Sequence, residues 1–311
     1  MNILITGIHG FVGSNLVKAL RAEHTLYGLD LVSPATEGVV QTFGWEALNN
    51  GSLPAVDVVI HLAGKAHDTR NTTNEQAYFD INTGLTEKIF AWFRQSGATK
   101  FIFFSSVKAV ADTVPGAFLT EDDTPDPLTP YGRSKLAAEQ LLNAASLPEG
   151  KQLYILRPCM IHGPGNKGNL NLLYRLVSKG LPWPLGAFDN RRSFLSVGNL
   201  AWVIGRLVNE AIPGGAYQLA DDEPLSTNEL ISLIAQSRGQ QARIWHLPNG
   251  WITALARVGG RLHLPLNPER LHKLTENYVV SNARIKQALG ISHLPVSARE
   301  GLAETLRGFD V

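Results

Sequence analysis

The sequence is poor in cysteine, in excess charge and in long apolar runs. Its single cysteine, Cys159, excludes a disulfide within the chain and is typical of a protein of the reducing cytoplasm. The formal net charge of +1 provides no general attraction to nucleic acid or to an anionic membrane. The longest apolar runs, such as VDVVIHLA at 56–63, have the length of strands and are too short to span a membrane.

An export signal and a metal-binding pattern are also missing from the sequence. The chain enters an apolar segment directly after Met1, without a basic leader or a cleavage-like segment, so we expect no export. None of the nine histidines is spaced with acidic residues or cysteine as metal ligands are, so we expect no metal site. These absences predict a cytoplasmic protein that acts on a small molecule, with no nucleic acid or membrane partner.

What the sequence does contain is an alternation of strand-like and helix-like segments. Apolar runs with β-branched or aromatic residues occupy 2–6, 25–30, 56–63, 100–106 and 152–158. Helical spacing occupies 11–22, 75–95 and 130–145. Near-continuous apolar strands separated by helices are typical of a parallel sheet covered on both faces. The sequence therefore predicts an α/β fold of the Rossmann type, with a doubly wound parallel sheet.

After Pro164 the sequence becomes rich in glycine, proline, asparagine and arginine, and helical spacing returns at 197–211, 226–238, 250–259 and 281–289. We predict two interleaved lobes. Residues 1–163 form the Rossmann lobe, completed by strand and helix segments within 194–220. Residues 164–311 form a smaller C-terminal α/β lobe that binds the substrate over the carboxyl edge of the sheet, where open α/β sheets bind ligands.

Three glycines at intervals of three, Gly7, Gly10 and Gly13, follow the first strand and open the first helix. Without Cβ atoms the chain can turn tightly and let a pyrophosphate approach the free N–H groups of the helix N-terminus. Asp30 ends the second strand, 17 residues after Gly13. Its carboxylate can accept hydrogen bonds from ribose hydroxyls and would repel a 2′-phosphate. This combination favours NAD over NADP as the cofactor.

The segment HLAG at 61–64 ends another strand of the predicted sheet. The small residues Ala63 and Gly64 let the chain pass close to a cofactor. We expect His61 to be a core histidine with satisfied hydrogen bonds.

Tyr131 and Lys135, in TPYGRSKLAAEQ, are four residues apart and lie on one face of the predicted helix. An ammonium beside a phenol lowers the pKa of the phenol, which prepares Tyr131 for proton transfer at a sugar hydroxyl or carbonyl. Ser105 and Ser106 end the preceding strand at the same edge of the sheet. One serine hydroxyl can hold the substrate oxygen, and we expect the other to cap the strand exit.

These motifs, with Asn82 in FDINTGL and the segment LRPCMIHGPG, resemble in kind and order the extended short-chain dehydrogenase/reductase family, in its nucleotide-sugar branch. The resemblance implies a catalytic set of Ser106, Tyr131 and Lys135, with Tyr131 as the acid/base and Lys135 also on the nicotinamide ribose. It implies cofactor contacts by Gly7, Gly10, Phe11, Val12, Gly13, Asp30, Leu62, Ala63, Gly64, Asn82, Ser105, Tyr131, Lys135 and Pro158.

The sequence is similar in more detail to UDP-N-acetylhexosamine 4-epimerases and 4-keto-6-deoxy-sugar reductases of surface-polysaccharide synthesis. That resemblance implies a UDP-sugar substrate, a homodimer, and substrate contacts by Asn169, Leu170 and Arg192. We expect Lys108 and Met160, at which the sequence departs from the family pattern, to contact the substrate as well. A guanidinium and loop amides also suit a diphosphate that the overall charge would not attract.

The sequence departs from the family pattern at several positions near the sugar and the adenine. Ala109-Val110-Ala111 replaces a common Val-Tyr-Gly, Met160 and His162 replace Asn and Tyr, and Trp45 or Glu46 stands where an acidic adenine-binding motif is common. These departures leave the identity of the sugar in the substrate undetermined.

Three functions stay open at the level of sequence. A nucleotide-sugar 4-epimerase is favoured slightly by Asp30, because a self-regenerating cofactor can be tightly held NAD. An NAD(P)H-dependent 4-keto-sugar reductase would use the same residues, and a non-catalytic NAD-binding protein is the third reading. A 4,6-dehydratase is disfavoured, since Val107-Lys108 occupies the place of the acidic pair that this reaction uses.

Overall fold

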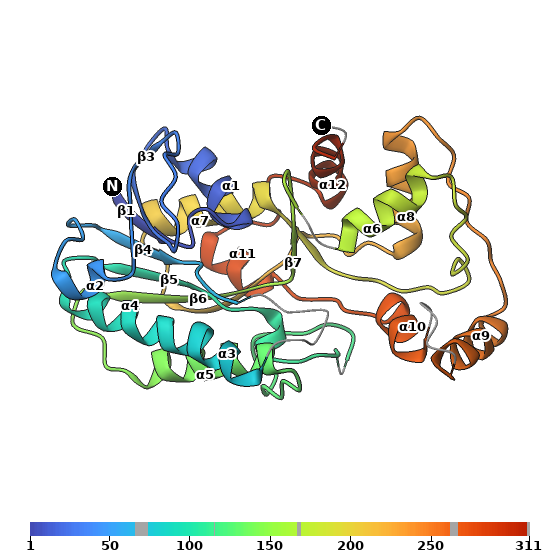
Figure 1. Ribbon diagram of the computed structural model, residues 1–311, viewed down its shortest axis with the longest axis horizontal. Helices are drawn as coiled ribbons and strands as arrows, with labels where there is room; N and C mark the ends of the chain where they lie inside the picture. The colour runs from blue at the N-terminus through green and yellow to red at the C-terminus, as the bar shows by residue number, and fades with distance from the viewer. Residues whose placement is uncertain (66–73, 115, 167–168, 262–266, 310–311) are drawn as a thin grey trace.

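The computed structural model describes residues 1–65, 74–114, 116–166, 169–261 and 267–309 (Figure 1). A seven-stranded sheet, in the order β3-β2-β1-β4-β5-β6-β9, forms the larger lobe, and every neighbouring pair is parallel. Its strands are β1 (Asn2–Thr6), β2 (Thr25–Leu29), β3 (Val39–Phe43), β4 (Val58–His61), β5 (Lys100–Phe104), β6 (Gln152–Pro158) and β9 (Gly215–Leu219). The predicted Rossmann-type fold is confirmed, and the order reverses between β1 and β4, where such sheets bind ligands.

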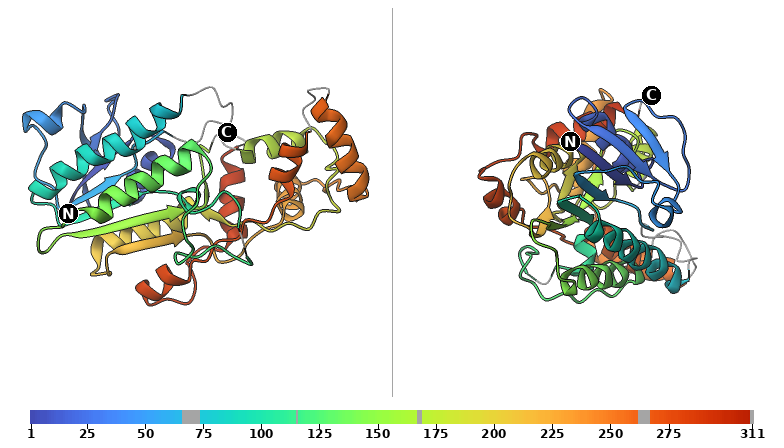
Figure 2. Two further views of the ribbon diagram at one scale, coloured as in Figure 1. Left: turned by 90° about the horizontal axis from the view of Figure 1, so that it is seen from below. Right: turned by 90° about the vertical axis from the view of Figure 1, so that its left-hand side faces the viewer.

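Helices cover both faces of this sheet (Figures 1 and 2). One face packs against α1 (Phe11–Leu20), α7 (Val197–Asn209) and α11 (Ala283–Leu289), and the other against α2 (Ala47–Asn50), α4 (Gly84–Gln95) and α5 (Pro130–Ala144). Strand residues alternate between the two apolar cores: Ile3 and Ile5 enter one, and Leu4 enters the other. All three side chains are fully buried. Burial on both faces explains the near-continuous apolar strands of the sequence.

The second lobe surrounds an apolar core of its own, which includes Leu230, Ile234 and Leu302. A two-stranded parallel sheet, β7 (Met160–His162) with β8 (Phe194–Ser196), leads into it. Its helices are α6 (Asn169–Ser178), α8 (Thr227–Ser237), α9 (Asn249–Arg261), α10 (Pro268–Thr275) and α12 (Ala298–Arg307). This lobe extends beyond the carboxyl ends of the large sheet (Figure 1).

Two segments of the larger lobe differ from the sequence-based expectation. The edge strand β3 was not predicted, because most of its side chains are at least partly exposed and Val40 is 64% exposed, so it has no apolar run. Helix α11 was assigned to the substrate lobe, and this is wrong. Ile285 and Leu289 are buried in the same core as α1 and α7, so α11 packs on the large sheet.

The predicted helix over 75–95 is interrupted by a wider turn. The chain runs through α3 (Glu75–Tyr78), a π-helical turn η1 (Phe79–Thr83) and then α4. Such π turns within α-helices are frequent at functional sites. Asn82 lies on this turn and is fully buried.

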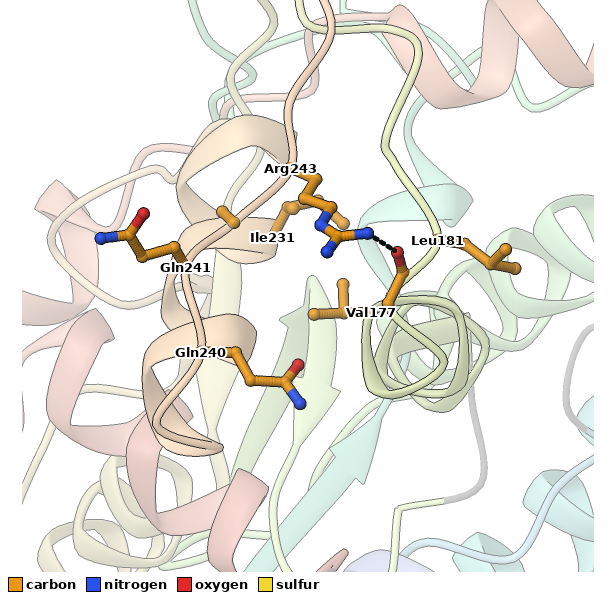
Figure 3. Close-up of a pocket in the computed structure, with 8 residues that line it drawn as sticks. Val177, Leu181, Ile231, Gln240, Gln241 and Arg243 are labelled. Atoms are coloured by element: carbon orange, nitrogen blue, oxygen red, sulfur yellow. Dashed lines mark hydrogen bonds between the residues drawn. The ribbon is translucent and has the colours of Figure 1, made fainter.

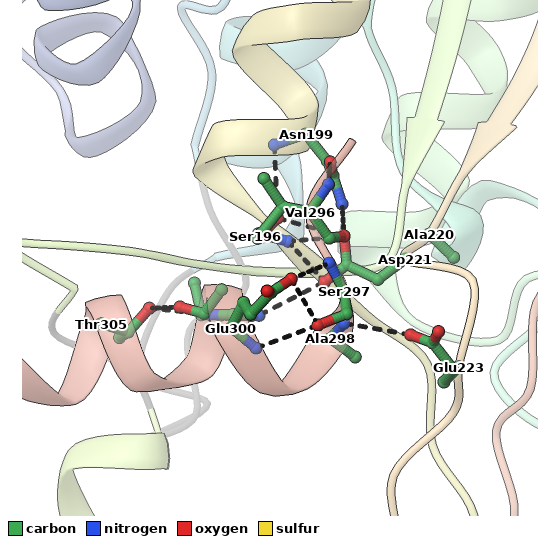
Figure 4. A network of polar contacts seen from close by, with 12 residues as sticks. Ser196, Asn199, Ala220, Asp221, Glu223, Val296, Ser297, Ala298, Glu300 and Thr305 are labelled. Carbon is green, nitrogen blue, oxygen red and sulfur yellow. Dashed lines mark hydrogen bonds and ion pairs between the residues drawn. The ribbon is translucent and has the colours of Figure 1, made fainter. Parts of the chain in front are cut away.

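A buried polar network joins the two lobes (Figure 4). The Asp221 carboxylate, just after β9, accepts hydrogen bonds from the Ser196 N–H at 2.9 Å and the Asn199 amide at 2.7 Å. The Asn199 amide also donates to the carbonyl of Val296 at 2.7 Å, ahead of α12. His162, which stands where the family pattern has Tyr, is buried with its Nδ1 2.8 Å from Thr305 Oγ1. His162 therefore helps to hold α12 against β7.

Candidate active site

The turn between β1 and α1 forms an open cradle of backbone N–H groups. Gly7 has a φ of +68°, in the left-handed region that favours glycine, and its N–H donates to the Leu29 carbonyl at 2.9 Å. A Cβ at Gly13 would lie 2.4 Å from the Ile8 carbonyl oxygen, so the turn requires glycine there. Gly10 is the N-cap of α1, and no side chain caps this helix end. The first N–H groups of α1 are therefore available to a pyrophosphate, as NAD requires.

Asp30 lies at the rim of this cradle, directly after β2. One carboxylate oxygen accepts the His9 N–H at 3.1 Å and the other accepts the Leu31 N–H at 2.7 Å. Each oxygen keeps a further lone pair for a ribose hydroxyl. Sequence reasoning did not identify His9, whose ring lies 3.1 Å from Thr42 Oγ1 and whose backbone N–H positions Asp30.

The HLAG segment brings the second half of the cofactor site together. A Cβ at Gly64 would lie 2.8 Å from Asn82 Oδ1 and 3.1 Å from Lys135 Nζ, so a larger residue would fill the space beside both. Asn82 accepts the Lys65 N–H at 2.7 Å and donates to Ser134 Oγ at 2.9 Å. Asn82 thus fixes the backbone after Gly64 to helix α5. Leu62 and Ala63 are partly exposed on the same segment.

His61 lies beneath this segment and is fully buried. Its Nδ1 is 2.6 Å from Thr6 Oγ1 and its Nε2 is 2.9 Å from Thr86 Oγ1, so both ring nitrogens have partners. Burial, with a smaller contribution from the Lys135 charge, lowers the pKa of His61 from 6.5 to about 3. His61 is therefore a neutral core histidine, as the sequence analysis expected.

This histidine predicts an acid-sensitive stability. The unfolded chain binds a proton at His61 below pH 6.5, whereas the folded chain does so only near pH 3. Unfolding free energy is then lost as the pH falls through this window, by about 1.4 kcal/mol per pH unit. Urea titrations between these pH values should show that His61→Gln has a shallower dependence on pH. An equal dependence in both proteins would contradict the assignment.

Tyr131 and Lys135 lie on the first turns of α5, whose N-cap Thr129 accepts the Gly132 N–H at 3.2 Å. The Tyr131 hydroxyl is hydrogen-bonded to Ser106, and the Lys135 ammonium donates to the Phe104 carbonyl at 2.8 Å. The structure thus brings the three predicted catalytic residues together at the carboxyl end of β5.

The pKa of Tyr131 is shifted in the direction opposite to the expectation. Burial raises the pKa of Tyr131, and the hydrogen bond to Ser106 opposes that rise. Lys135, whose ammonium donates to the Phe104 carbonyl, is not among the groups that shift this pKa. Burial also lowers the pKa of Lys135 to about 8, against the attraction of Glu139. Tyr131 is therefore protonated at neutral pH in the protein alone.

The adjacent serines have different surroundings. The buried Ser105 hydroxyl donates to the carboxylate of Glu139, which also forms a buried ion pair with Arg157 at 2.6 Å. Ser106 is directed to Tyr131 and also accepts the Lys108 N–H at 3.2 Å. Ser105 is thus the serine with a structural role, and it can reach a cofactor only through its backbone.

This contrast predicts opposite results for two alanine variants. Ser105→Ala removes one donor from a buried carboxylate and should lower the free energy of unfolding by about 1–3 kcal/mol, with kcat retained. Ser106→Ala should lower kcat by about 100-fold, through loss of a hydrogen bond to the reacting oxygen, with stability retained. Urea denaturation and steady-state kinetics on both variants separate the two roles. The reverse pattern would overturn the assignment.

Two predicted substrate residues converge on the segment 276–278, which sequence reasoning did not identify. Arg192 forms an ion pair with Glu276 at 3.0 Å, and burial lowers the pKa of Arg192. The Lys108 ammonium lies 4.1 Å from the centroid of the Tyr278 ring and donates to the Asp112 carbonyl at 2.9 Å. Both cations are therefore already engaged in the protein alone, and a bound anion would compete with these partners.

The remaining predicted contacts have mixed outcomes. The Leu170 side chain is 3% exposed in the core of the second lobe, so only the backbone at the start of α6 can face a ligand. The contact by Leu170 stays a prediction, and it concerns the backbone amide. Met160 is partly buried against the same core, and Pro158 ends β6 in a buried position beside Leu219. The side chain of Asn169 lies outside what the structure describes.

The last predicted positions lie at the start of α1 and on the adenine side of the cofactor site. Phe11 and Val12 are partly buried at the start of α1. Trp45 packs against the core under α2 and α4, and Glu46 is exposed as the residue before α2. Within the described ranges, no group of three or more His, Cys, Asp or Glu could hold a metal ion, and no helix is long and apolar enough to cross a membrane.

A cavity of about 480 Å³ lies apart from these residues, between α6, α8 and the chain at 240–243 (Figure 3). It is lined by residues that include Val177, Leu181, Ile231 and Arg243. The Arg243 guanidinium donates to the Gly180 carbonyl at 3.4 Å. None of the predicted site residues lines this cavity.

Comparison with known proteins agrees with the site. Residues 3–220 match the model of the NAD dependent epimerase/dehydratase family. The chain is 31% identical to a UDP-glucose 4-epimerase of Vibrio cholerae over 99% of this chain and 95% of that protein. It is 29% identical to the N-acetyl-α-D-glucosaminyl-diphospho-ditrans,octacis-undecaprenol 4-epimerase of Escherichia coli O157:H7 over 92% and 85% of the two chains.

Among solved structures, the UDP-glucuronic acid 4-epimerase of Bacillus cereus in complex with NAD is 21% identical. It has a TM-score of 0.75 and aligns with 100% of this chain and 99% of its own. The matched segment contains the glycine cradle, Asp30, Ser106, Tyr131 and Lys135. The chain therefore belongs to the NAD-dependent epimerase/dehydratase family, as an NAD-dependent nucleotide-sugar enzyme of the short-chain dehydrogenase/reductase type.

Proposed function

We propose that the protein is a nucleotide-sugar 4-epimerase that acts on a UDP-hexose or a UDP-N-acetylhexosamine through a 4-keto intermediate. The observation that carries the proposal is the hydrogen-bonded Ser106–Tyr131 pair, placed beside Lys135 and Gly64. This arrangement supports a proton-transfer role for Tyr131 beside the expected place of the nicotinamide ribose. The names of the two relatives above, both 4-epimerases, support this reading.

The chemistry assigned to the chain is a proton transfer at the C4 oxygen of the sugar. Bound NAD supplies the hydride acceptor and then the hydride donor at C4. Tyr131 takes the proton from the C4 hydroxyl as the carbonyl forms and returns it when the carbonyl is reduced. Ser106 donates a hydrogen bond to the same oxygen and holds it near Tyr131. Rotation of the 4-keto sugar in the site exposes its other face, so the hydroxyl is rebuilt with inverted configuration.

Lys135 prepares Tyr131 for this role. Its ammonium is held at the Phe104 carbonyl and faces the space above Gly64. A positive charge at this point stabilises a phenolate once it forms, and the ammonium can donate a hydrogen bond to a ribose hydroxyl oxygen. Because burial alone raises the pKa of Tyr131, the proton transfer depends on the charges that gather when cofactor and substrate bind.

The diphosphate is assigned to the entrance of the second lobe. Arg192 and Lys108 face the segment 276–278, and the N-terminus of α6 begins at Asn169. A diphosphate of charge about −2 would compete with Glu276 for Arg192, and the helix N-terminus would favour it further. Met160 lies on β7, partly buried against the core of the second lobe. The sugar itself is not specified by these contacts.

The test is turnover without added cofactor. The purified protein is incubated with UDP-glucose, UDP-galactose and their N-acetylated forms, and a denatured sample is assayed for released dinucleotide. Interconversion of C4 epimers without added NADH or NADPH is the expected result. Stoichiometric oxidation of NAD(P)H by a UDP-4-keto-6-deoxy-hexosamine, with no epimerisation, would replace the proposal by a reductase. Turnover that survives in Tyr131→Phe would favour a non-catalytic role for this site.

Three further parts of the proposal follow from the resemblance in sequence. They are a homodimeric assembly, a cytoplasmic location and a role in surface-polysaccharide sugar synthesis. Light scattering of the purified protein tests the first. Loss of one sugar from the surface polysaccharide after deletion of the gene tests the last.

A further inference from the structure

The net charge of +1 conceals an uneven distribution of charge along the chain. Of the 28 basic and 27 acidic residues of the chain, nine basic residues and one acidic residue fall within 164–186 and 238–275. The remaining 19 basic and 26 acidic residues belong to the rest of the chain. Those two segments include α6, α9 and α10 of the second lobe. The two segments therefore carry a net charge of +8, and the rest of the chain, which includes α8 and α12 of the second lobe, carries −7.

Helix α9 lies at the end of the second lobe farthest from β3 (Figures 1 and 2). Trp251, Leu255 and Val258 are 73%, 59% and 50% exposed. They are spaced by four and three residues, so they form a continuous apolar stripe along one side of the helix. Ile252 and Ala256 bury a different side of the helix in the lobe core. The exposed stripe is thus additional to the surface that folds the helix onto the lobe.

The stripe is bordered by positive charge. Arg257 and Arg261 are exposed on α9, and by helical geometry they lie on the side of the stripe away from Ile252. Neither forms an ion pair with a carboxylate whose position the structure describes. An exposed apolar stripe beside arginines, with a tryptophan at one end, is the pattern of a helix that lies in a membrane interface.

We propose that α9 docks the protein on an anionic lipid surface. Trp251, Leu255 and Val258 would enter the headgroup region, while Arg257 and Arg261 meet lipid phosphates. The net charge of +8 on the two segments selects this occupant, since an acidic bilayer attracts it. The expectation of no membrane partner rested on the net charge, which averages over this uneven distribution. The proposal is independent of the sugar chemistry above.

Vesicle co-sedimentation of the full-length protein tests the docking. Vesicles of phosphatidylcholine alone are compared with vesicles of phosphatidylcholine and phosphatidylglycerol at low salt. The protein should sediment with the second kind and stay in solution with the first. Arg257→Gln with Arg261→Gln should weaken binding by about fivefold for each arginine. Trp251→Gln with Leu255→Gln should weaken it by about tenfold or more.

Two matched variants on the larger lobe serve as controls. Val40→Gln with Phe118→Gln removes two apolar side chains that are 64% and 54% exposed, and Lys18→Gln with Arg94→Gln removes two exposed cations. Both controls should bind vesicles as the unchanged protein does. The proposal fails if the unchanged protein ignores phosphatidylglycerol, or if the controls weaken binding as much as the α9 variants. It also fails if light scattering shows a dimer that the α9 variants dissociate, since a second copy would then cover the stripe.

Discussion

Tyr131→Phe is expected to lower kcat by about 10²–10⁴-fold, which is the usual contribution of a positioned acid/base group. The substitution keeps the aromatic ring, which packs edge-on to Tyr78 at a centroid distance of 6.4 Å, and removes only the hydroxyl bonded to Ser106. The variant should therefore retain its fold and its bound NAD. Initial rates of epimerisation and the dinucleotide released on denaturation measure the two effects separately.

Tyr154→Phe is the matched control for this substitution. The Tyr154 hydroxyl is within hydrogen-bond distance of the Gln152 side-chain oxygen and of the Ile212 carbonyl, both at 2.7 Å. Tyr154 lies near the N-terminal end of β6, away from Ser106. Removal of the hydroxyl should lower stability by about 1 kcal/mol and leave kcat unchanged. If Tyr131→Phe lost stability and NAD while keeping its kcat, Tyr131 would be a packing residue and the proposed proton transfer would be wrong.

Gly13→Ala is expected to remove NAD binding and to destabilise the larger lobe. The added Cβ would lie 2.4 Å from the Ile8 carbonyl oxygen and 2.6 Å from that of Gly7. Both are backbone atoms of the cradle, so the turn itself has to move. Overpacking of this kind lowers the free energy of unfolding by about 1–3 kcal/mol. The Kd for NAD should rise by about tenfold or more, because the displaced turn no longer fits the pyrophosphate.

Gly205→Ala provides the control, because it makes the same change in another helix. Gly205 lies within α7, and a Cβ there would meet nothing within 4 Å. Alanine should stabilise that helix by up to about 1 kcal/mol, and NAD binding should be unchanged. Calorimetric titration with NAD and urea denaturation distinguish the two variants. Normal NAD affinity in Gly13→Ala would show that the glycine cradle is not the pyrophosphate site.

The parts of the fold that the sequence predicted are those with strong local signals. Strands buried on both faces have apolar runs, and the glycine turn and the four-residue spacing of Tyr131 and Lys135 are visible within a few residues. The edge strand β3 has no such run, and the place of α11 depends on where Ile285 and Leu289 find a core. Those outcomes are decided by tertiary packing, which a single segment does not reveal.

The sequence contains a signal for the different roles of Ser105 and Ser106. Glu139 follows Lys135 by four residues and therefore lies on the same face of α5. Ser105 and Ser106 are neighbours in extended chain, so their side chains diverge, and the buried Glu139 receives one of them. In contrast, the pairing of Lys108 with Tyr278 joins residues 170 positions apart, and no local pattern predicts it.

Labelled substrate tests most directly whether the hydride taken from the sugar returns to it. UDP-hexose carrying deuterium at C4 is incubated with the purified protein without added cofactor, and the C4 epimer is analysed by mass spectrometry and NMR. The account predicts that the epimer keeps deuterium at C4, because the same hydride is returned to the opposite face. Hydrogen in place of deuterium at C4 of the epimer would contradict it.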